Sequence, residues 1–264
     1  MTSLPIFQVA AFTDQNFGGN PAAVVPLEEW LDDSVMQKIA AENNLSETAF
    51  FVAIGPAEWH IRWFTPAVEV PLCGHATLAS AAVIRSKLGQ DDWPIRLQSA
   101  SGPLIIDIDS DDFVLDLPAN HGKPAELPAG LAAALGATAL ESYLAGNDIY
   151  MIVLSDEASV AALHPDFRAM AALTKHGVIV TAPGDKVDFV SRFFAPAIGI
   201  AEDPVTGAAH CVLTPYWSKR LNKKTLDARQ ISSRMGVLGC EDHGDRVKLR
   251  GKAVFFLSGN ITIE

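Results

Sequence analysis

Two stretches, RWFTPAV at residues 62–68 and RFFAPAI at residues 192–198, decide the predicted fold because they are copies of one pattern. Each stretch leads to a glycine followed by small residues, Gly74 in the first copy and Gly207 in the second. The stretches lie 130 positions apart and the glycines 133 positions apart, close to half of the 264 residues. An offset near half the chain length predicts an internal duplication with two related halves.

A segment with the composition of a linker separates the halves. Residues 117–124, LPANHGKP, are rich in proline, glycine and polar side chains, which is typical of a connection between domains. We therefore expect an N-terminal lobe of residues 1–118 and a C-terminal lobe of residues 119–264, with a return of the last strand to the first lobe left open.

Each half is expected to build a sheet on one long apolar helix. Residues 75–88 and 208–221 are runs of mostly small and apolar side chains that open just after a glycine, and such runs favour a buried central helix. Residues 32–43 carry one apolar stripe at helical spacing, and the aromatic and β-branched residues 48–53 predict a strand. Further strands with glycine turns are predicted at 247–249, 253–257 and 261–263. The predicted fold class is α+β, with two pseudo-symmetric lobes, each a mixed sheet wrapped around a central apolar helix.

The composition excludes several classes of protein. Lysine and arginine number 20 against 31 aspartates and glutamates, a formal net charge of −11, so nucleic acid and membranes are not expected as partners. Three cysteines without a CxxC or a Cys/His cluster argue against a disulfide framework and a metal site. No signal peptide is visible, and no apolar run reaches the roughly 18–20 residues that a bilayer requires. We therefore expect a cytoplasmic protein with three reduced cysteines.

The two glycine–helix junctions are candidate anion sites. A helix leaves its first N–H groups unpaired and carries partial positive charge there, and small residues such as Gly74, Gly207 and Ala208 let a ligand approach. If the halves pack about a pseudo-two-fold axis, both helix starts face one cleft that holds a carboxylate. Asn20, placed before a strand as Asn147 is in the second half, joins these expected binding residues. The alternative is that the glycines serve only turns and packing.

Few ionisable residues lie at these places. Glu47 enters a hydrophobic strand, where desolvation would raise its carboxyl pKa toward the working pH, as a general acid/base requires. His75 stands at the first helix start and Asp203 just before the second. The alternatives are an exposed strand-end glutamate, a first-turn histidine without ligand contact, and an acidic helix cap supplied by Asp203 or its neighbour Glu202.

Three ordered motifs carry a family resemblance. NLSETAF at residues 44–50, CGHAT at residues 73–77 and EDPVTG at residues 202–207 together resemble the phenazine-biosynthesis isomerase-like (PhzF) family, over essentially the whole chain. The resemblance implies the diaminopimelate-epimerase-like fold, with an active site between two related lobes. It also implies that the protein needs neither a metal nor an organic cofactor.

The same resemblance implies roles for individual residues. Glu47 matches the proton-shuttling glutamate of the family, His75 its motif histidine and Asp203 its second acidic residue. The implied activity is an isomerisation (EC 5 class): Glu47 moves a proton within the carbon skeleton of a small carboxylate-bearing metabolite, while Asp203 and His75 hold the substrate. The expected partners are this metabolite and, as an option, a second copy of the chain in a homodimer.

Two alternative functions stay open. The position after the second glycine is commonly Ser in the family, and here it is Ala208, so a non-catalytic small-molecule binding protein of the same fold is one alternative. A two-base amino-acid epimerase with two catalytic cysteines is another. Cys73 fits the first of these, but Pro204 stands where the second would lie and Cys211 is about one turn further along the helix.

Overall fold

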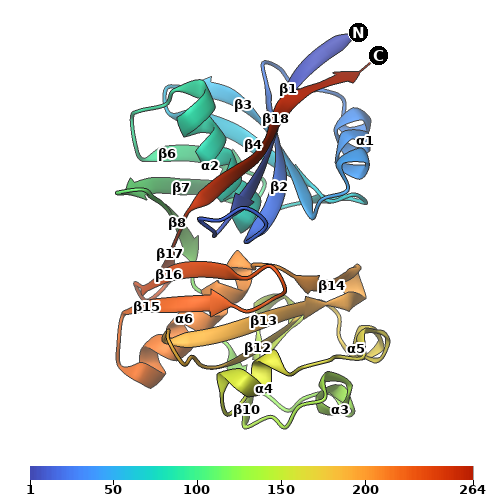
Figure 1. Ribbon diagram of the computed structural model, residues 1–264, viewed down its shortest axis with the longest axis vertical. Helices are drawn as coiled ribbons and strands as arrows, with labels where there is room; N and C mark the ends of the chain where they lie inside the picture. The colour runs from blue at the N-terminus through green and yellow to red at the C-terminus, as the bar shows by residue number, and fades with distance from the viewer. Residues whose placement is uncertain (264) are drawn as a thin grey trace. The chain divides into compact units, whose positions relative to one another are not determined.

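The computed structural model describes residues 1–263, and the chain divides into two units (Figure 1). Unit 1 comprises Met1–Asp116 together with the C-terminal residues from Arg250, and unit 2 comprises Leu117–Leu249. The C-terminal strand thus belongs to unit 1, where it pairs antiparallel with the first strand of the chain.

Unit 1 is a mixed sheet with helices on its faces. Its elements are β1 (Thr2–Ala11), β2 (Asn20–Leu27), α1 (Asp33–Asn43), β3 (Glu47–Gly55), β4 (Glu58–Phe64), β5 (Glu69–Val70), α2 (Gly74–Leu88), β6 (Ile95–Ser99), β7 (Gly102–Asp109), β8 (Asp112–Pro118) and β18 (Ala253–Ile263). Strand β2 pairs antiparallel with β1 and parallel with β3, β3 pairs antiparallel with β4, and β4 pairs parallel with β6, which pairs antiparallel with β7.

Unit 2 repeats this pairing scheme. Its elements are β9 (Lys123–Pro124), α3 (Leu131–Leu135), β10 (Glu141–Ala145), a 3₁₀ turn (Gly146–Asp148), β11 (Ile149–Val153), α4 (Glu157–Ala161), α5 (Phe167–Leu173), β12 (Val178–Pro183), β13 (Phe189–Ala195), a second 3₁₀ turn (Pro196–Ile198), β14 (Ile200–Asp203), α6 (Gly207–Leu221), β15 (Thr225–Gln230), β16 (Gly236–Asp242) and β17 (Arg246–Gly251). Strand β11 pairs antiparallel with β10 and parallel with β12, β12 pairs antiparallel with β13, and β13 pairs parallel with β15, which pairs antiparallel with β16. Two units with the same strand order and directions confirm the internal duplication.

The two central helices lie where the sequence predicts them. Helix α2 is buried from His75 through Ile84, and its alanines and serine let it lie close against β1, β2 and β3 (Figure 1). It ends at Gly89, whose φ of 71° is the left-handed conformation that closes many helices. Helix α6 has the same length and ends at Asn222, also left-handed. Among the described residues, no helix is long and apolar enough to cross a membrane.

The C-terminal strand differs from the prediction. The sequence indicated two short strands at 253–257 and 261–263 with a glycine turn between them, but β18 is continuous from Ala253 to Ile263. Gly259 pairs with Ile6 in the middle of the ladder to β1. The long antiparallel partner pairs with the segment on both sides of Gly259, with one register shift between Gln8 and Val9, and this pairing overrides the low strand propensity of one glycine.

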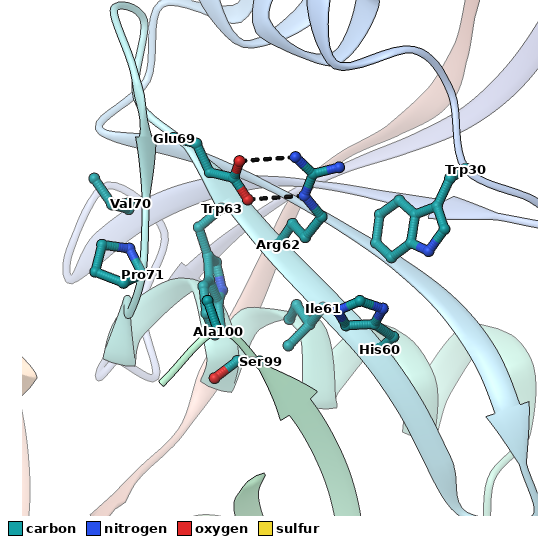
Figure 2. A pocket seen from close by; sticks show the side chains of 10 residues that line it. All are labelled: Trp30, His60, Ile61, Arg62, Trp63, Glu69, Val70, Pro71, Ser99 and Ala100. Carbon is teal, nitrogen blue, oxygen red and sulfur yellow. Dashed lines mark hydrogen bonds and ion pairs between the residues drawn. The ribbon is translucent and has the colours of Figure 1, made fainter. Parts of the chain in front are cut away.

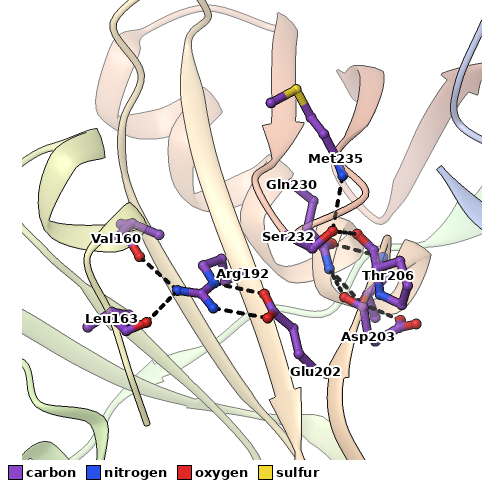
Figure 3. Close-up of polar contacts among 10 residues, drawn as sticks. Val160, Leu163, Arg192, Glu202, Asp203, Thr206, Gln230, Ser232 and Met235 are labelled. Carbon is purple, nitrogen blue, oxygen red and sulfur yellow. Dashed lines mark hydrogen bonds and ion pairs between the residues drawn. The ribbon is translucent and has the colours of Figure 1, made fainter. Parts of the chain in front are cut away.

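Each unit carries a matched arginine–glutamate pair. Arg62 on β4 donates two hydrogen bonds to Glu69, and Arg192 on β13 donates two to Glu202 (Figure 3). Arg192 also donates to the carbonyl oxygens of Val160 and Leu163 at the end of α4. The two pairs occupy the same place in the two sheets. The arginine of the repeated RWF/RFF pattern therefore forms the same ion pair with a glutamate in each unit.

The two arginines should differ in what they contribute to stability. Arg192 is 12% exposed and holds two backbone carbonyls besides Glu202, so Arg192→Met should cost about 2–3 kcal/mol of unfolding free energy. Arg62 pairs with the more exposed Glu69 and Asp33, so Arg62→Met should cost about 1 kcal/mol or less. Urea unfolding of both variants measures the difference, and equal losses would contradict this ranking.

Candidate active site

Four polar side chains meet at one end of the unit 1 sheet. Glu47 is the first residue of β3, Asn20 is the first residue of the neighbouring β2, and Cys73 and His75 flank Gly74 at the start of α2. The sheet register brings β2 and β3 to the same edge, because Ala22 lies opposite Glu47. The loop after β5 then delivers the helix start to that edge. The sequence predicts three of these four as site residues, and it places Cys73 at the same cleft, as a catalytic residue of the epimerase alternative.

His75 is the centre of the group. Its Nε2 lies 3.1 Å from Glu47 Oε2, and its Nδ1 lies 3.2 Å from Asn20 Nδ2 and 3.5 Å from Cys73 Sγ. When the Asn20 amide donates to Nδ1, the neutral ring carries its proton on Nε2, on the side that faces Glu47. When the ring is doubly protonated, Cys73 Sγ or the amide oxygen of a turned Asn20 accepts from Nδ1. The group therefore accommodates both protonation states of the ring.

Burial and charge act in opposite directions on these groups. Burial is the largest influence on Glu47 and raises its pKa, but His75 and Cys73 together lower it by more, so the net pKa lies below its ordinary value. Burial lowers the pKa of His75, whereas the neighbouring Cys73 and Glu47 raise it well above the ordinary value. Burial first, and then the Glu47 charge, raise the pKa of the Cys73 thiol to about 11. The neighbouring charges thus favour a Glu47 carboxylate and a protonated His75, and burial favours a neutral Cys73 thiol.

This charge state corrects one expectation. The sequence suggested that desolvation would raise the Glu47 pKa, and Glu47 is indeed only 13% exposed. The neighbouring His75 and Cys73 together reverse the net direction of the pKa shift. In the free protein Glu47 is therefore ready to accept a proton, which is the state that a general base needs.

A second polar network surrounds Asp203 in unit 2 (Figure 3). Thr206 Oγ1 donates to Asp203 Oδ2 at 2.5 Å, and the side chain of Gln230 accepts the Thr206 N–H at 2.8 Å and donates to the Asp203 carbonyl at 2.7 Å. Ser232 Oγ donates to the Pro204 carbonyl at 2.9 Å. The turn that carries Asp203 into α6 is thus fixed at several points. Gly207 begins the helix, and Ala208 follows it as an exposed residue.

Neighbouring acidic residues of β14 separate into two roles. Successive side chains of a strand point to opposite faces, so Glu202 reaches Arg192 while Asp203 reaches Thr206 (Figure 3). Asp203 and not Glu202 is therefore the candidate for ligand contact. The sequence put Asp203 forward for ligand contact and left open only which of the two residues caps the helix.

Unit 2 has no counterpart of Glu47. Thr48 lies opposite Phe64 in unit 1 and Val178 lies opposite Phe194 in unit 2, so the residue before Val178, Gly177, occupies the Glu47 position. A Cβ atom at Gly177 would lie 2.3 Å from Phe193 Cζ. The ring of Phe193 fills the space that a carboxylate side chain would need, so the acid/base candidate belongs to unit 1 alone.

The starts of the two central helices show which residue of unit 2 corresponds to Cys73. Cys73 immediately precedes Gly74, and Thr206 immediately precedes Gly207. The counterpart of Cys73 is therefore Thr206, and not Pro204 as the sequence suggested. Thr206 uses its hydroxyl on Asp203.

A hollow of about 300 Å³ lies elsewhere on unit 1, along the edge of β4 between β5 and the end of β6 (Figure 2). Arg62, Glu69 and Trp30 form one side of it, and Ser99 and Pro71 lie on the other. Its lining does not include Glu47 or His75. The Arg62 guanidinium is already engaged by Glu69 and Asp33, so this hollow offers no free charge to a ligand.

Comparison with known proteins identifies the relatives of this chain. The family model described as "Phenazine biosynthesis-like protein" matches residues 9–259. An uncharacterized isomerase of Pseudomonas aeruginosa is 48% identical over 258 residues, covering 98% of both chains. The crystal structure of a PhzF-family protein from Enterococcus faecalis superposes with a TM-score of 0.95 at 47% identity, covering 99% of this chain and 100% of that one.

A more distant structure supports the fold alone. A predicted epimerase from Pseudomonas aeruginosa superposes with a TM-score of 0.79 at 19% identity, over 99% of this chain and 100% of the other. The predicted α+β, epimerase-like fold and the resemblance that the three motifs carry are thereby confirmed.

Proposed function

This chain belongs to the phenazine biosynthesis-like protein family, and from that premise we propose that Glu47 is the general acid/base of a cofactor-independent isomerase. The relatives named isomerases support an isomerase in the broad sense. The proposed reaction moves one proton between two carbons of a small carboxylate-bearing metabolite.

The buried contact between Glu47 and His75 is the observation that carries the proposal. The carboxylate of Glu47 is largely desolvated. The imidazolium of His75, 3.1 Å away, balances its charge. In the proposed cycle the carboxylate takes a proton from a substrate carbon, leaving the electron pair on the carbon skeleton. The protonated Glu47 then returns the proton to another carbon, and His75 stabilises the negative charge that develops in between.

Asp203 and the start of α6 are the residues of unit 2 that we propose to bind the substrate. Asp203 would contact the substrate from the turn that Thr206 and Gln230 fix, and the helix starts at Gly74 and Gly207 would receive the substrate carboxylate. Gln230 is fully buried and holds the turn of Asp203 in place. This suits a binding role, because a ligand-contacting side chain is positioned by the residues that pack against it.

Replacement of Asp203 tests the contribution of unit 2. Asp203→Asn keeps the shape of the side chain but removes the charge, so we expect a loss of roughly 10- to 100-fold in ligand affinity and a further loss in rate. The control is Asp227→Asn, an exposed aspartate on β15, which should change neither. Unchanged affinity in Asp203→Asn would place the substrate on unit 1 alone.

A binding screen identifies the substrate directly. Native mass spectrometry with a panel of cyclic and amino-carboxylate metabolites reveals the compound that the protein retains. That compound, incubated with the protein in heavy water, should acquire deuterium at a carbon if the proposal is right. Retention without deuterium incorporation would instead favour the alternative that Ala208 suggests, a binding protein without turnover.

A two-cysteine epimerase is not favoured by the side chains in place. Such an enzyme needs a thiol from each half, and the position that matches Cys73 holds Thr206. Cys211 lies buried within α6, where burial raises its thiol pKa to about 12. A buried and protonated thiol is a poor base.

A further inference from the structure

The cluster of Glu47, Cys73 and His75 has the geometry of a metal site as well as of a proton site. One ligand atom from each residue can be chosen so that all three lie within 4.8 Å of one another. His75 Nε2 lies 3.1 Å from Glu47 Oε2 and 4.0 Å from Cys73 Sγ. Around a tetrahedral zinc ion, with bonds of about 2.0–2.3 Å, neighbouring ligand atoms lie about 3.3–3.7 Å apart. Small side-chain movements therefore bring all three atoms onto one ion.

We propose that these three residues bind a thiophilic divalent cation of the Zn²⁺ class, and that the bound ion occupies the lone pair with which Glu47 takes up a proton and the Nε2 position with which His75 stabilises charge. The part of this proposal that concerns inhibition rests on the proposed function of Glu47; the part that concerns binding does not. The ion acts here as an inhibitor and not as a cofactor, since metal and shuttled proton compete for the same atoms.

The donor set selects the type of metal. One thiolate, one imidazole and one carboxylate suit Zn²⁺, Co²⁺ and Cd²⁺, whereas Mg²⁺ and Ca²⁺ prefer oxygen ligands in greater number. Three protein ligands leave a fourth tetrahedral position for water or for a ligand oxygen, as at catalytic zinc sites. Of the three ligands, Glu47 is the most exposed, at 13% against 6% for His75.

Two neighbouring contacts hold the ligands in place. Asn20, fully buried, contacts His75 Nδ1 at 3.2 Å and leaves Nε2 directed at Glu47. Thr77 Oγ1 donates to the carbonyl oxygen of Cys73 at 2.5 Å, which ties the residue before α2 to the first turn of the helix. Such outer contacts orient metal ligands in known sites and contribute to their affinity.

Binding of the metal ion releases protons and involves no electron transfer. The ion displaces the thiol proton of Cys73 and the Nε2 proton of the His75 imidazolium, and both protons pass to solvent. A sulfur–metal, a nitrogen–metal and an oxygen–metal bond form. The divalent charge of the ion is then met by the thiolate and the Glu47 carboxylate, so the buried group carries no net charge, which favours it in a desolvated place.

Cobalt gives this site a direct spectroscopic signature. The protein is freed of metal with a chelator and titrated with Co²⁺ at fixed pH, where a thiolate ligand produces a sulfur-to-cobalt charge-transfer band in the near ultraviolet. We expect one equivalent of Co²⁺ to saturate the band and Zn²⁺ to displace it. No saturable band at one equivalent would overturn the proposal.

Matched cysteine variants locate the band. Cys73→Ser should abolish the charge-transfer band and weaken Zn²⁺ binding by on the order of 100-fold or more, since even outer contacts contribute 10- to 100-fold. Cys211→Ser, a buried cysteine of unit 2, should retain both. Persistence of the band in Cys73→Ser would overturn the assignment. Because a folding defect could also remove the band, the thermal midpoint of each metal-free variant is measured. His75→Gln and Glu47→Gln should each weaken the binding of Zn²⁺ while the protein stays fully folded.

Inhibition is tested separately with the retained metabolite. Zn²⁺ should stop deuterium incorporation at the concentration that displaces Co²⁺, and a chelator should restore it. If Zn²⁺ binds at Cys73 and exchange continues, the metal site stands and the role of Glu47 in proton transfer is wrong. If exchange requires Glu47 but no Co²⁺ band forms, the metal site is wrong and the proposed function stands.

Discussion

Glu47→Gln should lower the rate of proton transfer by about 10²–10⁴-fold, the usual contribution of a general acid/base, while ligand affinity stays within a few-fold. Glutamine keeps the length of the side chain and a hydrogen-bonding end that can still contact His75 Nε2. It cannot accept or return a proton. The measurement is deuterium incorporation from heavy water into the metabolite that the wild-type protein retains, followed by mass spectrometry over time.

The matched control is Glu58→Gln. Glu58 begins β4 in the same unit and accepts a hydrogen bond from Gln98, so its replacement repeats the chemical change away from His75 and should leave exchange unaltered. His75→Ala should fall between Glu47→Gln and Asp203→Asn in its effect on rate. If Glu47→Gln exchanges at the wild-type rate, the assignment is wrong, and Asp203 or Cys73, which borders the same histidine, becomes the better candidate.

The duplication could be predicted because the same sequence pattern occurs twice, at an offset close to half the chain length. The residues that carry it have clear structural reasons: Arg62 and Arg192 each bind a glutamate, and Gly74 and Gly207 each begin a central helix. The helices were predictable for a second reason, since a buried helix shows as an uninterrupted run of small and apolar residues. Both signals are local or repeat at a fixed offset, and a sequence displays such signals directly.

The charge state of Glu47 could not be predicted in the same way. Its sequence neighbours Thr48, Ala49 and Phe50 indicate burial, and burial alone raises a carboxyl pKa. His75 and Cys73 together reverse the direction, and the register of β3 and the loop before α2 bring His75 to 3.1 Å from Glu47. A net pKa shift depends on this spatial pairing, so it becomes visible only when the fold is known.

Gln230 escapes sequence-based prediction for a related reason. Nothing in TLDARQ, the sequence of β15, marks its last residue as part of a site. The parallel pairing of β13 with β15 places Gln230 opposite Ser191, and from there its amide reaches both Asp203 and Thr206. The one sequence signal for Gln230 is its place as a polar residue at the end of the strand that follows a central helix. This signal becomes informative only once the order of the strands is known.

Trp217→Ala should destabilise the protein more than any of the other single replacements. Trp217 is fully buried on α6, and its ring stacks on Phe189 of β13 with a centroid distance of 5.7 Å and an interplanar angle of 3°. Its Nε1 donates to Thr181 Oγ1 on β12 at 3.0 Å. Removing a buried tryptophan leaves a large cavity, and we expect a loss of about 3–5 kcal/mol in unfolding free energy, measured by urea denaturation of the full chain.

Two further variants separate packing from hydrogen bonding. Thr181→Val keeps the volume but leaves the indole N–H buried without its acceptor, which should cost roughly 1–3 kcal/mol. Trp217→Phe keeps an aromatic ring against Phe189 and should lie between Thr181→Val and Trp217→Ala. Because α6 also presents Gly207 and the turn of Asp203, ligand affinity in Trp217→Ala should fall together with stability, whereas Glu47→Gln loses rate with stability retained. A Trp217→Ala protein as stable as Thr181→Val would mean that the stacked ring contributes little, and that the sheet holds α6 through its remaining contacts.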